Sequence, residues 1–312
     1  MNKHNTFALR ILETWRSGDS IETINDCTFL LHGLPRELNT SRRGQGGVGI
    51  VLNNIGTQSW KEAGSLIITD FGPRIIATRL KVADQRNKPC CVFLISAYAP
   101  IGAAKQLTWN HFLDNLQKCI DIKHENDIMI IGCDTNSSMG TCNDARIGPS
   151  ISSIGKFGIP YRNAAGTRFL TFLEINHLIA TSTYFQKNCY VTLRHHRSKL
   201  PYQIDHILVE KWNFCCVINV STVKPVLDTD HLAIFCKLRI LHSFRKAKPN
   251  KRPLLKLDTD QVRVNTELSS RFNRFVREKV EEVSHNPSFE TLVEAMKEGA
   301  LSIITKKASL FS

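Results

Sequence analysis

The sequence predicts an α+β domain in which many short strands and a few helices pack in layers. From about residue 28 to residue 240, short apolar runs alternate with polar loops. The runs have the length of strands and are rich in β-branched or aromatic residues. Only two segments in this region have apolar residues at helical spacing. Many strands with few helices favour a layered α+β domain over a regular alternation of strands and helices.

The expected strands are apolar runs bounded by polar or turn residues, at 48–52, 65–69, 75–80, 91–98 and 127–132. The first expected helix covers 107–123, with apolar residues at positions 109, 112, 113, 116 and 120. The second covers 167–178 and places Phe169, Leu170, Leu173 and Leu178 on one face.

The composition favours a polyanionic partner. The 312 residues include 41 Lys and Arg against 28 Asp and Glu, a formal charge of +13. Lys and Arg bind nucleic acid by neutralising phosphates and releasing condensed counterions. The ten cysteines include no C-x-x-C motif, and most lie in apolar runs, which is typical of free buried thiols in a reducing compartment. With no apolar run long enough for a membrane span and no secretory signal, we expect a nuclear or cytoplasmic protein without a membrane.

The composition changes at residue 243. Residues 243–256 contain six basic residues, two prolines and no acid, which predicts a basic linker. Beyond it, apolar residues recur at helical spacing up to Val283 and again after Pro287. We therefore expect a domain at 1–242, a linker at 243–256 and a helical appendage at 257–312.

A glycine-rich segment at 44–49 formally matches the dinucleotide-binding motif G-x-G-x-x-G. That motif requires a preceding strand and a helix that opens within it. Here Ser41, Arg42 and Arg43 precede the glycines and an apolar strand follows. We interpret the glycines as a turn and strand, and expect no small-molecule cofactor.

Polar residues stand at the ends of several apolar strands. Glu13 follows the run 7–12, and Tyr98 ends another strand shortly before Pro100. Asp134 and Asn136 follow the run 128–131 and, being two residues apart, lie on one face of an extended chain. A lone carboxylate is often only a strand end, and Asp is a common turn residue, so these residues alone leave a structural role open.

Two acid–histidine pairs accompany apolar strands in the second half of the chain. They are Asp205–His206 and Asp230–His231. Burying an acid and an imidazole among apolar residues costs several kcal/mol unless they are paired or bind a metal. Two such pairs in one chain, together with Asp134 and Asn136, are not expected by coincidence and indicate a functional site.

In order along the chain, these segments resemble the exonuclease–endonuclease–phosphatase family, most closely the endonuclease domains of non-LTR retrotransposons. The resemblance covers about residues 7–240. Residues 12–15 are similar to its "QET" metal motif, with Leu12 in place of Gln, and residues 96–100 to its phosphate-contacting tyrosine strand. Residues 132–136 resemble its "GDFN" segment, with Cys133 as a departure. Residues 203–206 and 229–231 resemble the closing "IDH" and "SDH" motifs.

The resemblance implies a DNase I-like, four-layer fold, a two-sheet β-sandwich flanked by helices. That family begins with an Asn-bearing strand, which the residues before the "QET"-like motif do not supply. We therefore expect the first strand to be missing, the domain to be truncated at its amino end, and activity to be impaired. The helical appendage resembles the connector that leads to a reverse transcriptase domain, which the resemblance implies as a partner.

The resemblance also implies roles for individual residues. Mg²⁺ or Mn²⁺ would be held by Glu13, with Asp230 close by. Asp134 would position or deprotonate the attacking water, and Asn136 would bind this water or the phosphate. His231, oriented by Asp205, would stabilise charge on the phosphate or accept a proton. The expected contacts to phosphate or DNA are Tyr98, Thr192, Thr229, Arg194, His196, Arg197 and Lys199.

Three functions remain open from the sequence. The first is a metal-dependent DNA-nicking endonuclease of retrotransposon origin. The second is a phosphatase or RNA deadenylase of the same fold, which the short connection from Thr192 to Asp205 and the basic charge disfavour. The third is an inactive DNA-binding module. A solvated run of charge explains the basic residues at 194–199 as well as a DNA contact does.

Overall fold

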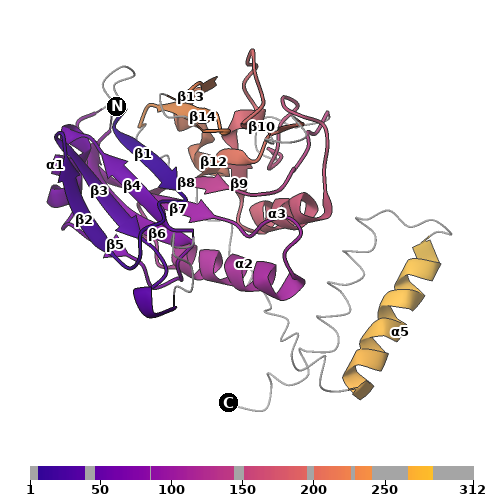
Figure 1. Cartoon of the computed structure of the whole chain (residues 1–312). Coiled ribbons are helices and arrows are strands. Elements are labelled where there is room, and N and C mark those ends of the chain that lie inside the picture. Colours follow the sequence, from indigo (N-terminus) through magenta and orange to yellow (C-terminus); the bar gives the residue numbers. More distant parts are fainter. Residues whose placement is uncertain are drawn as a thin grey trace. The chain divides into compact units, whose positions relative to one another are not determined.

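A computed structural model describes residues 6–38, 46–84, 86–143, 151–194, 200–225, 229–240 and 266–283 of the chain. The chain divides into two compact units, Met1–Ser243 and Phe244–Ser312. The first unit combines several sheets with few helices, so the predicted α+β class is confirmed (Figure 1).

Two larger sheets form the body of the first unit. One has four antiparallel strands in the order β1–β4–β3–β2, which are Ala8–Leu12, Val48–Leu52, Cys27–His32 and Ser20–Ile24. The other has the order β5–β6–β7–β8–β12–β9, which are Ile67–Ile68, Ile75–Ala83, Pro89–Tyr98, Ile128–Asp134, Asp205–Glu210 and Leu178–Ala180. Of the paired strands in this six-stranded sheet, only β7 and β8 run parallel to each other. Two strand pairs complete the unit, β10 with β11 (Leu193–Arg194, Pro201–Tyr202) and β13 with β14 (Val217–Val223, Ala233–Leu238).

The six-stranded sheet is the central layer, with a core on each face. Strand β7 shows the alternation. Phe93 and Ile95 enter the core beneath the helices Gln106–Asp121 and Ala164–Ile175, whereas Val92 and Leu94 enter the core shared with the four-stranded sheet. A third, smaller core joins β13 and β14 to the same face as the four-stranded sheet, because Ile130 packs in both of these cores. The predicted two-sheet sandwich flanked by helices is therefore confirmed.

The helices are α1 (Asn54–Glu62), α2 (Gln106–Asp121) and α3 (Ala164–Ile175). Helix α2 agrees with its prediction within two residues, but α3 begins three residues earlier than predicted. The cause is Asn163, whose side chain accepts a hydrogen bond from the Gly166 N–H and caps the helix. Asn53 caps the unpredicted helix α1 in the same way.

The edge strands β1 and β2 of the four-stranded sheet and both strands of the β13–β14 pair have one neighbour each among the described residues. Strand β1 pairs with β4, and β14 pairs with β13. The strand expected within the glycine-rich segment is present: Gly46 and Gly47, with φ of +61° and +90°, lead into β4. No helix in the described parts of the chain is long and apolar enough to cross a bilayer.

Within the second unit the structure describes the helix α5 (Thr266–Val283), where the sequence predicts the first appendage helix. The linker 243–256 and the helix expected after Pro287 lie outside the described residues. The boundaries of the predicted linker and appendage stay predictions.

The sequence of the linker leads to a proteolysis prediction. Because it combines basic residues with prolines and has no acid, we expect trypsin to cut the chain first between Arg245 and Lys256. Mass spectrometry of early fragments would identify the cut. A linker that survives while sites within Met1–Ser243 are cut would contradict the prediction.

Candidate active site

Three predicted site residues lie in one row across the central sheet. The register pairs Tyr98 of β7 with Asp134 of β8, and Asp134 with Asp205 of β12. Because side chains alternate along a strand, all three lie on the face that carries the four-stranded sheet and β13–β14. Asp134 and Asp205 are buried, with 3% and 5% of their surface exposed. The fold thus places two carboxylates side by side in a protected position.

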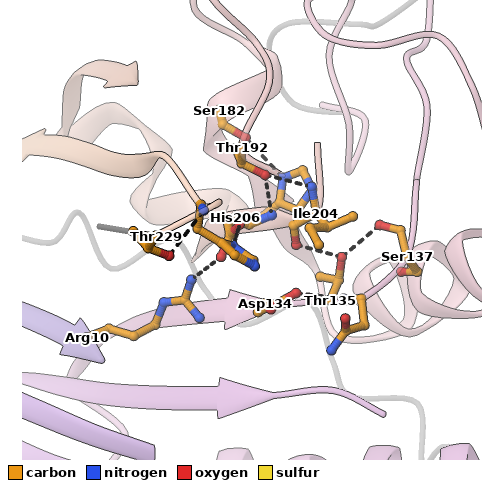
Figure 2. A network of polar contacts seen from close by, with 12 residues as sticks. Arg10, Asp134, Thr135, Ser137, Ser182, Thr192, Ile204, His206 and Thr229 are labelled. Carbon is orange, nitrogen blue, oxygen red and sulfur yellow. Dashed lines mark hydrogen bonds and ion pairs between the residues drawn. The ribbon is translucent and has the colours of Figure 1, made fainter. Parts of the chain in front are cut away.

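Asp205 is held from three directions. Its Oδ1 accepts a hydrogen bond from Arg10 Nη2 at 2.6 Å, and its Oδ2 lies 2.9 Å from His231 Nδ1. Thr192 is fully buried, and its Oγ1 accepts hydrogen bonds from the backbone N–H groups of Ile204 and Asp205. Figure 2 shows Arg10, Thr192 and Asp134 around this point. The predicted orientation of His231 by Asp205 has its geometric basis here, whereas the phosphate contact of Thr192 stays a prediction.

Arg10 is a part of the site that the sequence analysis missed. It comes from the middle of β1 in the four-stranded sheet and crosses to Asp205 in the other sheet. Gly132 makes room for it, because a Cβ at Gly132 would lie 2.6 Å from the Arg10 Cδ. The signal in the sequence was a single Arg within an otherwise apolar strand.

The ligand atoms of Asp134, Asp205 and His231 all lie within 4.8 Å of one another. Burial, and secondly the charge of Asp205, raise the pKa of Asp134 above its usual range. Burial would raise the pKa of Asp205 too, but the hydrogen bond to His231 and the charge of Arg10 hold it below the usual range. Burial lowers the pKa of His231, but its hydrogen bond to Asp205 and the nearby carboxylates raise it more, to about 9. At neutral pH, His231 is therefore a cation beside an anionic Asp205.

Glu13 joins this row through Tyr98. The Tyr98 hydroxyl donates a hydrogen bond to Glu13 Oε1 at 2.6 Å, and the Arg74 guanidinium lies 5.1 Å from the centre of the Tyr98 ring. Burial and the bond to Glu13 raise the pKa of Tyr98, so the phenol keeps its proton. Asn136 has a φ of +43°; its backbone N–H donates to Asp134 Oδ1, and its side chain donates to the carbonyl of Ala99. Glu13 is thus bonded to Tyr98, and Asn136 to Asp134.

The remaining predicted residues lie just before β14, in β10, or outside the described residues. Asp230 and Thr229 are exposed; Thr229 Oγ1 accepts a hydrogen bond from the His231 N–H. The exposed Arg194 donates its backbone N–H to the Asp230 carbonyl. His196, Arg197 and Lys199 lie outside the described residues, so their DNA contacts stay predictions.

In the Asp205–His206 pair, only the aspartate belongs to the site. His206 is buried and alternates away from Asp205, and its Nδ1 lies 3.0 Å from Ser182 Oγ. Burial lowers its pKa to about 4, so His206 is neutral at pH 7. The structure gives the two acid–histidine pairs different surroundings.

The donors at this end of the sheets fit a hard divalent cation. Carboxylate oxygens dominate, which suits Mg²⁺ or Mn²⁺. Both oxygens of Asp205 are engaged by Arg10 and His231, so Asp205 orients other groups. The predicted ligands Glu13 and Asp230 are not in the group of three close ligand atoms; Glu13 adjoins it through Tyr98, and Asp230 through His231.

Solved structures identify the fold as that of the exonuclease–endonuclease–phosphatase proteins. An AP endonuclease from Leishmania major has a TM-score of 0.53 and 13% identity, with 77% of this chain and 80% of that chain covered. The catalytic domain of Xenopus laevis APE2 has a TM-score of 0.51 and 14% identity, with 78% and 87% covered. The 3′ phosphatase NExo from Neisseria, bound to a product DNA hairpin, has a TM-score of 0.50 and 14% identity, with 74% and 88% covered.

Sequence comparison finds distant relatives. Craniofacial development protein 2 of Bos taurus is 27% identical over 197 residues, which are 59% of this chain and 32% of that protein. The protein of the same name in Tragulus javanicus is 26% identical over 160 residues, or 50% of this chain and 26% of that protein. The matches thus span about a third of these relatives or less. No protein-family model matches the chain.

Proposed function

We propose that this chain is a divalent-metal-dependent endonuclease of retrotransposon origin that hydrolyses a DNA phosphodiester bond and nicks one strand. The observation that carries the proposal is the group of Asp134, Asp205 and His231, which come from distant parts of the chain. The fold shared with AP endonucleases supports the reaction class, and the net charge of +13 supports DNA as the partner. The cysteine usage supports a reducing compartment, the nucleus or the cytoplasm.

Each side chain at the site has its own role in the proposed hydrolysis. Asp134 has a raised pKa and accepts the proton of the attacking water, which Asn136 helps to position. His231 is protonated and fixed by Asp205, so it donates a hydrogen bond to the charge that develops on the phosphate. Its raised pKa favours this role over proton acceptance, a choice that the sequence left open. Tyr98 keeps its proton, which it donates to Glu13, and its contact to a phosphate oxygen stays a proposal.

The metal would be held by Glu13 and Asp230, with Asp134 as the third carboxylate nearby. Bound there, Mg²⁺ or Mn²⁺ supplies positive charge to the phosphate and lowers the pKa of a bound water. Thr192, Thr229, Arg194, His196, Arg197 and Lys199 stay proposals for DNA contact. A reverse transcriptase domain as partner of the appendage likewise stays a proposal.

A plasmid-nicking assay tests the function. The full chain, with Mg²⁺ or Mn²⁺, should convert supercoiled plasmid to open circles, and EDTA should stop the reaction. We expect His231→Ala to reduce the rate about 100- to 1,000-fold, the usual loss when one group that stabilises a developing charge is removed. The matched control is His124→Ala, which changes an exposed histidine in the loop after α2 and should leave the rate unchanged. Nicking that survives EDTA or His231→Ala would contradict the proposal.

A second candidate is a DNA-binding module without hydrolysis. It is favoured by Arg10, which occupies one oxygen of Asp205. DNA binding in gel-shift assays without nicking under either metal would support this candidate and exclude the endonuclease. A phosphatase or deadenylase would release phosphate or shorten an adenylate tail in place of nicking plasmid.

A further inference from the structure

Trp15 is a large aromatic side chain on the surface, two residues after Glu13. It is 52% exposed. Single exposed apolar residues are common on proteins and carry no meaning by themselves. Trp15 differs in three respects: its proximity to the candidate active site along the chain, its backbone conformation, and the way in which its segment is held.

The chain leaves β1 in a conformation that bulky residues rarely adopt. Glu13 and Trp15 have φ of +49° and +57°, in the left-handed region. Left-handed backbone is strained for residues other than glycine, so the surrounding structure must hold Glu13 and Trp15 in place. Strain of this kind is common at functional sites. One of the two, Glu13, accepts the hydrogen bond from Tyr98.

Backbone contacts fix the segment that carries Trp15. The Trp15 N–H donates to the Gly46 carbonyl at 3.0 Å, and the Thr14 N–H donates to the Gly47 carbonyl at 3.4 Å. The Arg16 carbonyl oxygen packs so closely on Gly33 that a Cβ there would lie 2.1 Å from it. Trp15 is therefore presented on a fixed backbone, which reduces the entropy lost when its ring meets a ligand.

We propose that Trp15 stacks on an unpaired nucleobase next to the scissile phosphate and so contributes to substrate recognition. This inference rests on the proposed function. Indole rings bind nucleobases through their faces. The exposed neighbour Arg16 pairs with Glu22 at 3.3 Å, so the indole ring is the group offered to the base. In a fully paired duplex both faces of a base are covered by its neighbours. The substrate favoured by Trp15 is therefore DNA with an unpaired or unstacked base.

Binding measurements without divalent metal test this role apart from catalysis. With a single-stranded oligonucleotide in EDTA, we expect Trp15→Ala to weaken binding about 10-fold, the usual loss of one stacking aromatic. The loss should be smaller with the fully paired duplex, and Trp15→Phe should retain most of the affinity. Trp15→Asn suits the left-handed backbone, so an equal loss in this variant would exclude backbone relaxation as the cause. The matched control is Trp212→Ala, which removes an indole that is 51% exposed and should leave binding unchanged.

Tryptophan emission gives a second, direct measurement. The chain has four tryptophans, and Trp60 and Trp109 are buried. In Trp212→Phe, Trp15 is thus the one exposed indole, and oligonucleotide should quench its emission; in Trp15→Phe, quenching should be lost. Unchanged affinity of Trp15→Ala, or emission of Trp212→Phe that does not respond to bound DNA, would overturn the inference. Failure of the unaltered chain to bind DNA would instead overturn the proposed function.

Discussion

Replacing Asp134 by Asn is expected to reduce plasmid nicking about 100- to 10,000-fold and, at pH 8 without metal, to make the protein more stable. The first effect follows from the loss of the proton acceptor, because Asn keeps the shape but cannot take the proton from water. The second follows from the surroundings of Asp134, which is 3% exposed and adjoins Asp205. An ionised carboxylate is costly there.

The direction of the stability change with pH follows from the same carboxyl group. Burial and Asp205 raise the pKa of Asp134 to about 7. The folded chain keeps this proton up to about pH 7, whereas an unfolded Asp loses it near pH 4. Between these values the folded state binds more protons, so its stability falls as the pH rises and stays low above pH 7. The gain from Asp134→Asn should therefore be absent near pH 4 and grow to about 4 kcal/mol at pH 8, because each pKa unit corresponds to about 1.4 kcal/mol.

Urea unfolding in EDTA, followed by the emission of the buried Trp60 and Trp109, measures this gain. Asp127→Asn is a suitable comparison, because Asp127 is also buried but accepts two hydrogen bonds from Arg79. That change should lower the free energy of unfolding at pH 8. If Asp134→Asn is the less stable of the two at pH 8, or if it nicks DNA at the rate of the unaltered protein, our view of Asp134 is wrong.

The strands that end at the site could be predicted because each couples a strongly apolar run to polar residues. Strands β7 and β8 deliver Tyr98 and Asp134 in this way, and both runs were expected as strands. The row formed by Tyr98, Asp134 and Asp205 could not be predicted, because it depends on the register of three strands separated by long connections. A shift of one residue in any of them would turn its side chain to the helical face.

Arg10 and strand β2 are two features that the sequence did not predict. An Arg within a strand usually points to solvent, and only the facing Gly132 on the other sheet allows Arg10 to enter the site. Strand β2 was missed because half-buried and exposed residues alternate along it, as is common at a sheet edge, so no continuous apolar run marks it. Both features depend on contacts across the sandwich, which local sequence patterns do not contain.

Replacing Arg10 by Met is expected to lower the free energy of unfolding by about 3 kcal/mol at pH 7. Met keeps the apolar stem but removes the guanidinium that pairs with the buried Asp205 at 2.6 Å. Breaking a buried pair by removing one partner costs about 3–5 kcal/mol, because the other charge stays buried. His231 still pairs with Asp205 at 2.9 Å, which places the cost at the lower end. Without Arg10 the pKa of Asp205 would be higher than in the unaltered protein, so the deficit should shrink as the pH falls and Asp205 is protonated in the folded state of both proteins.

Arg79→Met is the matched control for this change. Arg79 and Arg10 each have 20% of the side chain exposed, and each pairs with a buried aspartate, Asp127 or Asp205. Both variants should lose stability in urea, but only Arg10→Met should also lower the nicking rate, because only Asp205 orients His231. Adding Asp205→Asn to Arg10→Met should recover part of the stability, since the unpaired charge is gone, without recovering the rate. A deficit below about 1 kcal/mol in Arg10→Met would show that water reaches Asp205 and that the pair is not buried as the structure has it.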